Sequence, residues 1–197
     1  MLTLAIQAGG ESRRMGEDKA LKSFLGRPLI VHLLERLGGI ADEILVTTNR
    51  PAEYAFLGVR LVSDRYPGRG ALGGLYTALE AAGQPLVAVV ACDMPFASRE
   101  FFLQAREWMQ EGWDVIVPRS SAGYEPLHAL YRRETCLPAV ASALESGAWR
   151  VISWFERVRV REVTADEMRR LDPSGRAFWN VNTPEEFAQA EAMARGG

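Results

Sequence analysis

Short hydrophobic runs alternate with amphipathic stretches along the whole chain. Residues 3–8 form a nearly continuous apolar run, which is typical of a strand buried on both faces of a parallel sheet. In residues 28–37, Leu29, Leu33 and Leu37 share one helical face, and a proline suits the first turn. The same reading predicts strands at residues 43–48, 59–64, 85–93, 114–117, 127–131 and 158–163, and helices at residues 70–82, 101–109, 135–144 and 184–194.

This order of strands and helices predicts an α/β fold, because parallel strands need crossover helices between them. We expect a mostly parallel sheet with helices on both faces. The sequence shows no internal repeat, low-complexity stretch or linker, so we expect one domain over residues 1–197. In open α/β sheets the ligand binds beyond the carboxyl ends of the strands, and the candidate chemistry of this chain gathers at that edge.

A glycine-rich, basic loop follows the first predicted strand, from Gly9 to Lys19. Glycine lets backbone N–H groups approach an anion, and basic side chains supply the countercharge. Only two of the 23 basic residues are lysines: Lys19, which ends this loop, and Lys22, three residues later. A lysine ammonium fits between phosphate oxygens as a compact charge. The alternative is a solvated surface loop, but the glycines, the preceding strand and the lysine together favour a phosphate site.

Two aspartates end predicted strands at the same edge of the sheet. Asp93 follows the most apolar strand, and the next helix has its own candidate cap in Ser98. Mg²⁺ typically takes one or two carboxylates together with substrate phosphates, so we predict Asp93 as a magnesium ligand rather than a capping residue. For Asp64 both a ligand-binding role and a turn-capping role stay open.

Two further segments have competing interpretations. Residues 68–73 match GxGxxG, but three residues separate them from the preceding strand, which disfavours a nicotinamide-binding fingerprint. Residues 183–186 form a capping box for the last helix, which leaves Asn180 and Asn182 unexplained. These asparagines are two positions apart and share one face of an extended segment, where two amides suit a polar ligand.

Composition narrows the class of protein. The net charge of −2 gives no basic footprint for nucleic acid, and no apolar run reaches the ~20 residues of a membrane span. The chain enters a strand at once, so we expect no signal peptide and a cytoplasmic location. The two cysteines and two histidines, Cys92, Cys136, His32 and His128, lack the spacing of a zinc site.

Together these motifs resemble a known family. Over essentially its full length the chain is similar to the nucleotidyltransferases that join a nucleoside triphosphate to a phosphorylated acceptor. Among them it most resembles the molybdenum cofactor guanylyltransferases. The resemblance rests on Ala8-Gly9-Gly10-x-Ser12-x-Arg14-Met15-Gly16-x-Asp18-Lys19, Gly26-x-Pro28-Leu29, residues 67–74, Cys92-Asp93-x-Pro95, Glu125-Pro126-Leu127-x-Ala129-Leu130-Tyr131, Trp149-Arg150-Val151 and residues 180–186.

The resemblance implies a Rossmann-like sheet of the nucleotide-diphospho-sugar transferase type that binds GTP and Mg²⁺. Gln7 stands where the family usually has Leu, and Thr47 where some members have Asn; both would lie near the base. The implied catalytic residues are Lys19, Arg14 and Asp93, with Asp93 as the metal ligand. The implied nucleotide-binding residues are Gln7, Ala8, Gly9, Gly10, Lys19, Thr47, Asp64 and Asp93, and the implied acceptor-binding residues are Asn180, Asn182 and Arg150.

The activity that the resemblance implies is transfer of GMP from GTP to the terminal phosphate of molybdopterin, with or without molybdenum, and release of pyrophosphate. We expect a nucleotide-binding half at about residues 1–95 and an acceptor-binding half at about residues 96–197. We also expect a monomer whose partners insert molybdenum or accept the cofactor. Open alternatives are cytidylyl transfer to molybdopterin, transfer to a sugar 1-phosphate or cobinamide phosphate, and a non-catalytic protein that binds nucleotide or cofactor.

Overall fold

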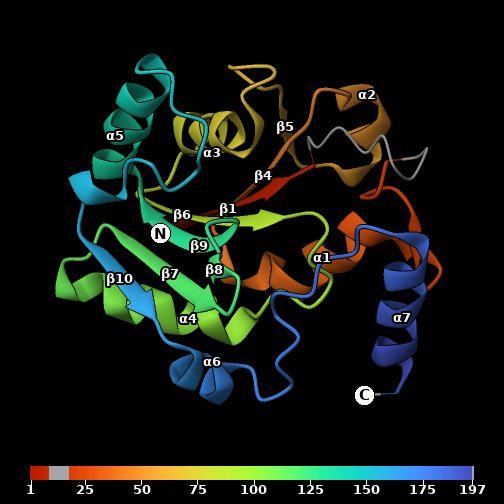
Figure 1. Cartoon of the computed structure of the whole chain (residues 1–197). Coiled ribbons are helices and arrows are strands. Elements are labelled where there is room, and N and C mark those ends of the chain that lie inside the picture. Colours follow the sequence, from red (N-terminus) through yellow and green to blue (C-terminus); the bar gives the residue numbers. More distant parts are fainter. Residues whose placement is uncertain (9–17, 197) are drawn as a thin grey trace.

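The computed structural model describes residues 1–8 and 18–196, and Figure 1 shows a central sheet with helices on both of its faces. The main sheet has eight strands in the order β10–β7–β9–β6–β1–β4–β5, with β8 hydrogen-bonded to β7. These strands are β1 (Leu2–Gln7), β4 (Glu43–Thr47), β5 (Arg60–Val62), β6 (Leu86–Ala91), β7 (Val115–Ser120), β8 (Gly123–Tyr124), β9 (His128–Arg132) and β10 (Val160–Val163). The helices are α1 (Leu29–Leu37), α2 (Pro51–Tyr54), α3 (Gly70–Ala81), α4 (Arg99–Trp108), α5 (Arg133–Glu145), α6 (Ala165–Leu171) and α7 (Pro184–Arg195). In the described part of the chain, none of them has the length and apolar character needed to cross a membrane.

The central strand β1 runs parallel to both of its neighbours, β4 and β6. The register places Gln7 beside Thr47 and Ala91, so the three strands end at the same level. Two strands run antiparallel to the others: β9, between β6 and β7, and the short β8, which pairs with β7. The prediction of a mostly parallel sheet covered on both faces is confirmed. Strands from both predicted halves of the chain share this sheet, because β6 pairs with β9.

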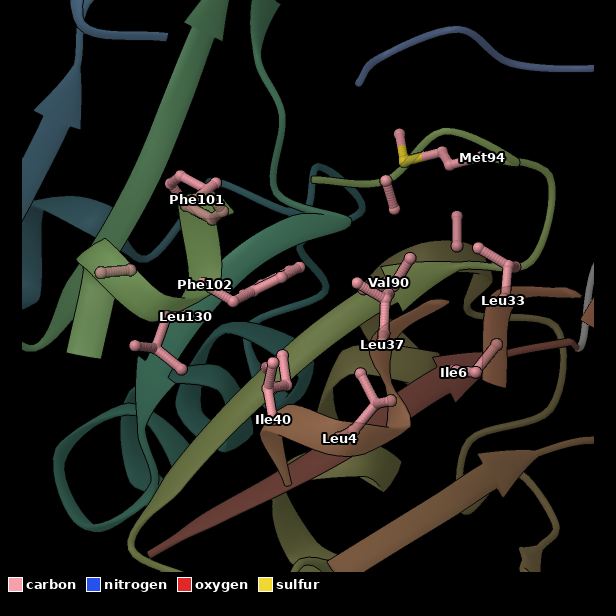
Figure 2. Close-up of a cluster of buried hydrophobic side chains, with 14 of the residues drawn as sticks. Leu4, Ile6, Leu33, Leu37, Ile40, Val90, Met94, Phe101, Phe102 and Leu130 are labelled. Carbon is pink, nitrogen blue, oxygen red and sulfur yellow. The ribbon is translucent and has the colours of Figure 1, made fainter. Parts of the chain in front are cut away.

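Alternate residues of β1 face two separate hydrophobic layers, because successive side chains of a strand point to opposite faces. Leu4 and Ile6 pack with side chains of α1, α4 and α6, in the cluster that Figure 2 shows in part. Ala5 faces the other layer, which α3 and α5 cover. All three residues are fully buried. This two-sided burial explains the apolar run in the sequence, which ends where Gln7 reaches the edge of the sheet.

A smaller cluster attaches the last helix to the beginning of the chain. Here α7 packs against α1 and against the hairpin of β2 (Ser23–Phe24) and β3 (Arg27–Pro28). The buried residues of this cluster are Phe24, Leu29, Phe96, Val181, Phe187 and Ala190. This packing brings the segment that precedes α7 close to the segment that precedes the hairpin, although the two lie at opposite ends of the sequence.

The sequence pattern predicted the strands of three or more residues and the long helices but missed several short elements. The hairpin, β8, α2 and α6 were not predicted, because strands of two residues and helices of four or seven residues are too short to show a clear period. Pro28 lies in β3 and directly precedes α1, rather than lying in its first turn. Two predicted caps are confirmed: Ser98 Oγ accepts from Phe101 N at 3.1 Å, and a capping box begins α7 at Thr183.

Candidate active site

A cleft of about 650 Å³ lies where β1, β4 and β6 end and α3 begins. This is the edge at which open α/β sheets bind their ligands. Six residues that the sequence singled out for nucleotide binding line it: Gln7, Ala8, Lys19, Thr47, Asp64 and Asp93. The other described lining residues are Asp18, Asn49, Pro67, Gly68, Gly70, Ala71, Gly74, Ala91, Cys92 and Leu127.

The remaining predicted site residues have different positions. Gly9, Gly10 and Arg14 lie outside the described residues. Arg150 is exposed, and neither it nor Asn180 belongs to the lining as far as the described chain forms it. Their assignment to the acceptor stays a prediction. Asn182 is joined to the cleft through a direct contact with Lys19.

Lys19 links the cleft to the segment before α7. Its Nζ donates to Asn182 Oδ1 at 2.7 Å and lies 4.0 Å from Asp93 Oδ2. The side chains of Lys19 and Asp93 are only 14% and 25% exposed. The backbone N–H of Val181 donates to the Asp93 carbonyl at 2.9 Å. An ammonium, a carboxylate and an amide thus converge from three distant parts of the chain.

The environment of Asp93 fits a metal ligand. Burial raises the pKa of Asp93, and the nearby Lys19 offsets only part of this rise. The carboxylate therefore lacks compensation for its lost hydration, which a bound cation would supply. Within the described chain, no three His, Cys, Asp or Glu side chains gather to hold a metal by themselves. Such a donor set suits Mg²⁺ shared between one carboxylate and substrate phosphates.

Asp18, the residue before Lys19, is held by hydrogen bonds from other parts of the chain. Its Oδ2 accepts from the Arg50 guanidinium at 2.6 Å and from the Tyr54 hydroxyl at 2.7 Å. Its Oδ1 accepts from the backbone N–H of Ala20 at 3.1 Å. These bonds tie the start of this segment to α2. Arg50 and Tyr54 were not predicted, because no local pattern connects them with Asp18.

Asp64 forms a reciprocal pair with Asn49 at the wall of the cleft. Asn49 Nδ2 donates to Asp64 Oδ2, and the Asp64 backbone N–H donates to Asn49 Oδ1, both at 3.1 Å. Burial raises the pKa of Asp64, and the bond from Asn49 works against this rise. The family resemblance implied a role for Thr47, at the end of β4, but Asn49, two positions later, was missed. Thr47 itself is almost fully buried.

Gln7 lies beneath the beginning of α3. A Cβ atom at Gly74 would come within 2.8 Å of Gln7 Oε1, so glycine makes room for this side chain. Gln7 Nε2 is buried and has no hydrogen-bond partner among the described residues. An unpaired buried donor costs roughly 1–3 kcal/mol, so its presence beside the cleft calls for an explanation. A ligand acceptor group in the cleft is one way to satisfy it.

Two polar residues near the cleft are poorly suited to chemistry. Burial and the neighbouring Asp93 raise the pKa of the Cys92 thiol, so it stays protonated at neutral pH and is a weak nucleophile. His128 is fully buried, and its Nε2 accepts from the Ser98 backbone N–H at 2.9 Å. Burial lowers the pKa of His128 to about 4, so it is a neutral structural side chain. The chemistry of the cleft therefore rests on its charged groups, and Lys19 and Asp93 suit the binding of an anion and a cation.

Comparisons with known proteins find similar sequences and a similar structure over nearly the full length of the chain. A family model described as "MobA-like NTP transferase domain" matches residues 4–161. The chain is 33% identical to "Molybdenum cofactor guanylyltransferase" of Desulfosudis oleivorans, over 100% of this chain and 97% of that protein. It is 37% identical to "Probable molybdenum cofactor guanylyltransferase" of Pelotomaculum thermopropionicum, over 98% and 93%. The crystal structure of molybdopterin-guanine dinucleotide biosynthesis protein A from Archaeoglobus fulgidus superposes with a TM-score of 0.84 at 25% identity, over 99% of this chain and 100% of that one.

Proposed function

Because this chain belongs to the MobA-like NTP transferase family, we propose that it is a guanylyltransferase that transfers GMP from GTP to the terminal phosphate of molybdopterin. The products are molybdopterin guanine dinucleotide and pyrophosphate. The names of the full-length relatives support this activity. The observation that carries it is the convergence of Lys19 and Asp93 at the cleft, since a triphosphate with its metal needs a fixed cation and a carboxylate.

The acceptor supplies its own nucleophile. A phosphate oxygen of molybdopterin attacks the α-phosphorus of GTP and forms a new P–O bond. The bond between the α-phosphorus and the α–β bridging oxygen breaks, and its electron pair leaves with pyrophosphate. No covalent bond to the protein is needed, which agrees with the protonated state of Cys92. The protein has to align two anions that repel each other and offset the charge on the leaving oxygen.

In this mechanism Lys19 offsets the charge of the triphosphate, and Arg14 and the backbone amides at Gly9 and Gly10 would complete that role. Asp93 would hold Mg²⁺, because its carboxylate is largely buried, has a raised pKa and lies beside Lys19 in the cleft. When bound, Mg²⁺ neutralises phosphate charge and orients the phosphate chain.

The nucleoside would occupy the part of the cleft formed by Gln7, Ala8, Thr47 and Asp64. Asn49 contributes there because its side-chain amide donates to the Asp64 carboxylate and accepts from the Asp64 backbone N–H. The buried Nε2 of Gln7 gives this region a donor that suits a base carbonyl. The base itself would cover residues at the end of β1.

The acceptor would bind with residues from the second half, through Asn180, Asn182 and Arg150. Since Asn182 Oδ1 accepts from Lys19, we assign its Nδ2 to the acceptor. We further propose that the protein acts in the cytoplasm as a monomer and passes its product to proteins that insert molybdenum or accept the cofactor.

Pyrophosphate release tests the proposal. Purified protein with Mg²⁺ and GTP should release pyrophosphate only when molybdopterin is added, and GTP should be preferred to CTP and ATP. Molybdopterin with and without molybdenum should be compared, together with a sugar 1-phosphate as an unrelated acceptor. Release with the sugar phosphate but not with molybdopterin would refute the acceptor, and no release with any pair would refute the enzyme activity.

A further inference from the structure

Three backbone hydrogen bonds, from Asn182 and from the residues on either side of it, hold Asn182 in place. Glu186 Oε2 accepts from the backbone N–H groups of Asn182 at 2.7 Å and of Thr183 at 3.0 Å. The preceding residue, Val181, is fully buried and donates its N–H to the Asp93 carbonyl. The helix cap and the Asp93 backbone therefore fix the point from which the Asn182 side chain extends.

The other end of the contact is fixed as well. Asp18, which precedes Lys19, is bound by Arg50 and Tyr54, so the Lys19 backbone also starts from a defined position. The bond to Asn182 Oδ1 is the one hydrogen bond recorded for Lys19 Nζ within residues 1–8 and 18–196. An ammonium has three N–H donors, so this bond orients the group and leaves further donors for an anion.

The atom that accepts the hydrogen bond from Lys19 is the amide oxygen of Asn182, which belongs to an uncharged group. Asp93 lies 4.0 Å from Nζ and already supplies one negative charge. A second carboxylate at the Asn182 position would neutralise the ammonium and repel a triphosphate. An amide oxygen restrains the ammonium and leaves its positive charge available.

We propose that Asn182 is a positioning residue for Lys19: its Oδ1 aims the ammonium at the nucleotide phosphates in the cleft, before any acceptor is bound. This inference rests on the proposed function, because it assigns the anion at Lys19 as the triphosphate of the nucleotide. It gives Asn182 a role on the nucleotide side, in addition to the acceptor contact assigned to its Nδ2. The segment before α7 thereby becomes part of the nucleotide site.

The test is calorimetric binding of GTP with Mg²⁺ in the absence of acceptor. Asn182→Ala should weaken binding roughly 2- to 12-fold, the range for losing one hydrogen bond. Asn182→Asp keeps the shape but adds a charge, so it should weaken binding more than Asn182→Ala does. Gln189→Ala, which removes an exposed amide of α7, is the matched control and should bind like wild type.

A double-mutant cycle separates positioning from a structural effect. In a Lys19→Ala background, Asn182→Ala should change GTP affinity less than about twofold, because the side chain that it aims is gone. Thermal unfolding of every variant checks that the helix cap survives. Three results would each overturn the inference. The first is wild-type GTP affinity in Asn182→Ala, and the second is GTP binding by Asn182→Asp that is as tight as, or tighter than, that of Asn182→Ala. The third is an equal loss of affinity on Asn182→Ala in the Lys19→Ala background. Pyrophosphate release by the wild-type protein is measured alongside, and its absence would refute the proposed function without deciding the binding comparison.

Discussion

The close approach of Gly74 and Gln7 predicts that Gly74→Ala lowers the free energy of unfolding in the wild-type protein but raises it when the Gln7 side chain is absent. In Gly74→Ala, the three heavy atoms nearest the new Cβ all belong to Gln7, at 2.8, 3.2 and 3.5 Å. Overpacking typically costs about 1–3 kcal/mol, and we take the lower half of that range because the atoms met belong to the end of the flexible Gln7 side chain, which can shift in part. Alanine in a helix interior is favoured over glycine by about 0.5–1 kcal/mol. Gly74→Ala should therefore lower the free energy of unfolding by about 1 kcal/mol in the otherwise wild-type protein.

Removing the Gln7 side chain removes the obstacle. In a Gln7→Ala background, Gly74→Ala should raise the free energy of unfolding by about 0.5–1 kcal/mol, because only the helix preference remains. Gly73→Ala is the matched control on the same helix. Its Cβ would meet the Tyr66 carbonyl oxygen at 2.9 Å and Arg69 Cβ at 3.0 Å, so Gln7→Ala should not relieve it.

Urea unfolding of the four proteins in each cycle measures the coupling. We expect a coupling free energy of about 1–2 kcal/mol for Gly74 with Gln7 and a value near zero for Gly73 with Gln7. If Gly74→Ala has the same effect in both backgrounds within about 0.5 kcal/mol, the close contact does not limit position 74, and the reasoning is wrong.

Three further predictions concern the site. Lys19→Ala should lower kcat/KM by about 10²–10³, equivalent to roughly 2.7–4 kcal/mol, and a tenfold or smaller loss in steady-state assays would contradict its role. Asp93→Asn should abolish Mg²⁺-dependent turnover. Because burial raises the pKa of Asp93, ionising this carboxyl costs the metal-free wild-type protein stability as the pH rises from the ordinary Asp pKa through the raised value. Asn carries no charge and avoids this cost. Above that pH range, metal-free Asp93→Asn should therefore melt at the same temperature as the wild-type protein or at a higher one. Asn180→Ala and Arg150→Ala should raise the KM for molybdopterin while the calorimetric Kd for GTP stays near wild type; a weaker Kd would place them on the nucleotide side.

Local patterns predicted the parts of the site that strands and caps position. Asp93 was identifiable because a carboxylate directly after a wholly apolar strand lies at the carboxyl edge of the sheet. The capping box at Thr183 was identifiable because its spacing is fixed by helix geometry. Both signals are local, so tertiary packing did not change them.

Contacts between distant segments could not be predicted in this way. The Lys19–Asn182 bond joins residues 163 positions apart and depends on α7 packing against the hairpin, which is itself too short to predict. The Asn49–Asp64 pair depends on where β4 and β5 end. The low exposure of Lys19 follows from the same packing, whereas a basic loop residue suggests an exposed side chain.

The transfer of label from GTP tests the central claim most directly. GTP labelled at the α-phosphate or at the γ-phosphate is incubated with protein, Mg²⁺ and molybdopterin, and the products are separated. Guanylyl transfer predicts that the α-label enters the pterin product and the γ-label leaves in pyrophosphate, with both reactions lost in Asp93→Asn. Transfer of the γ-label to the pterin, or recovery of the α-label only as GDP or GMP, would contradict the account.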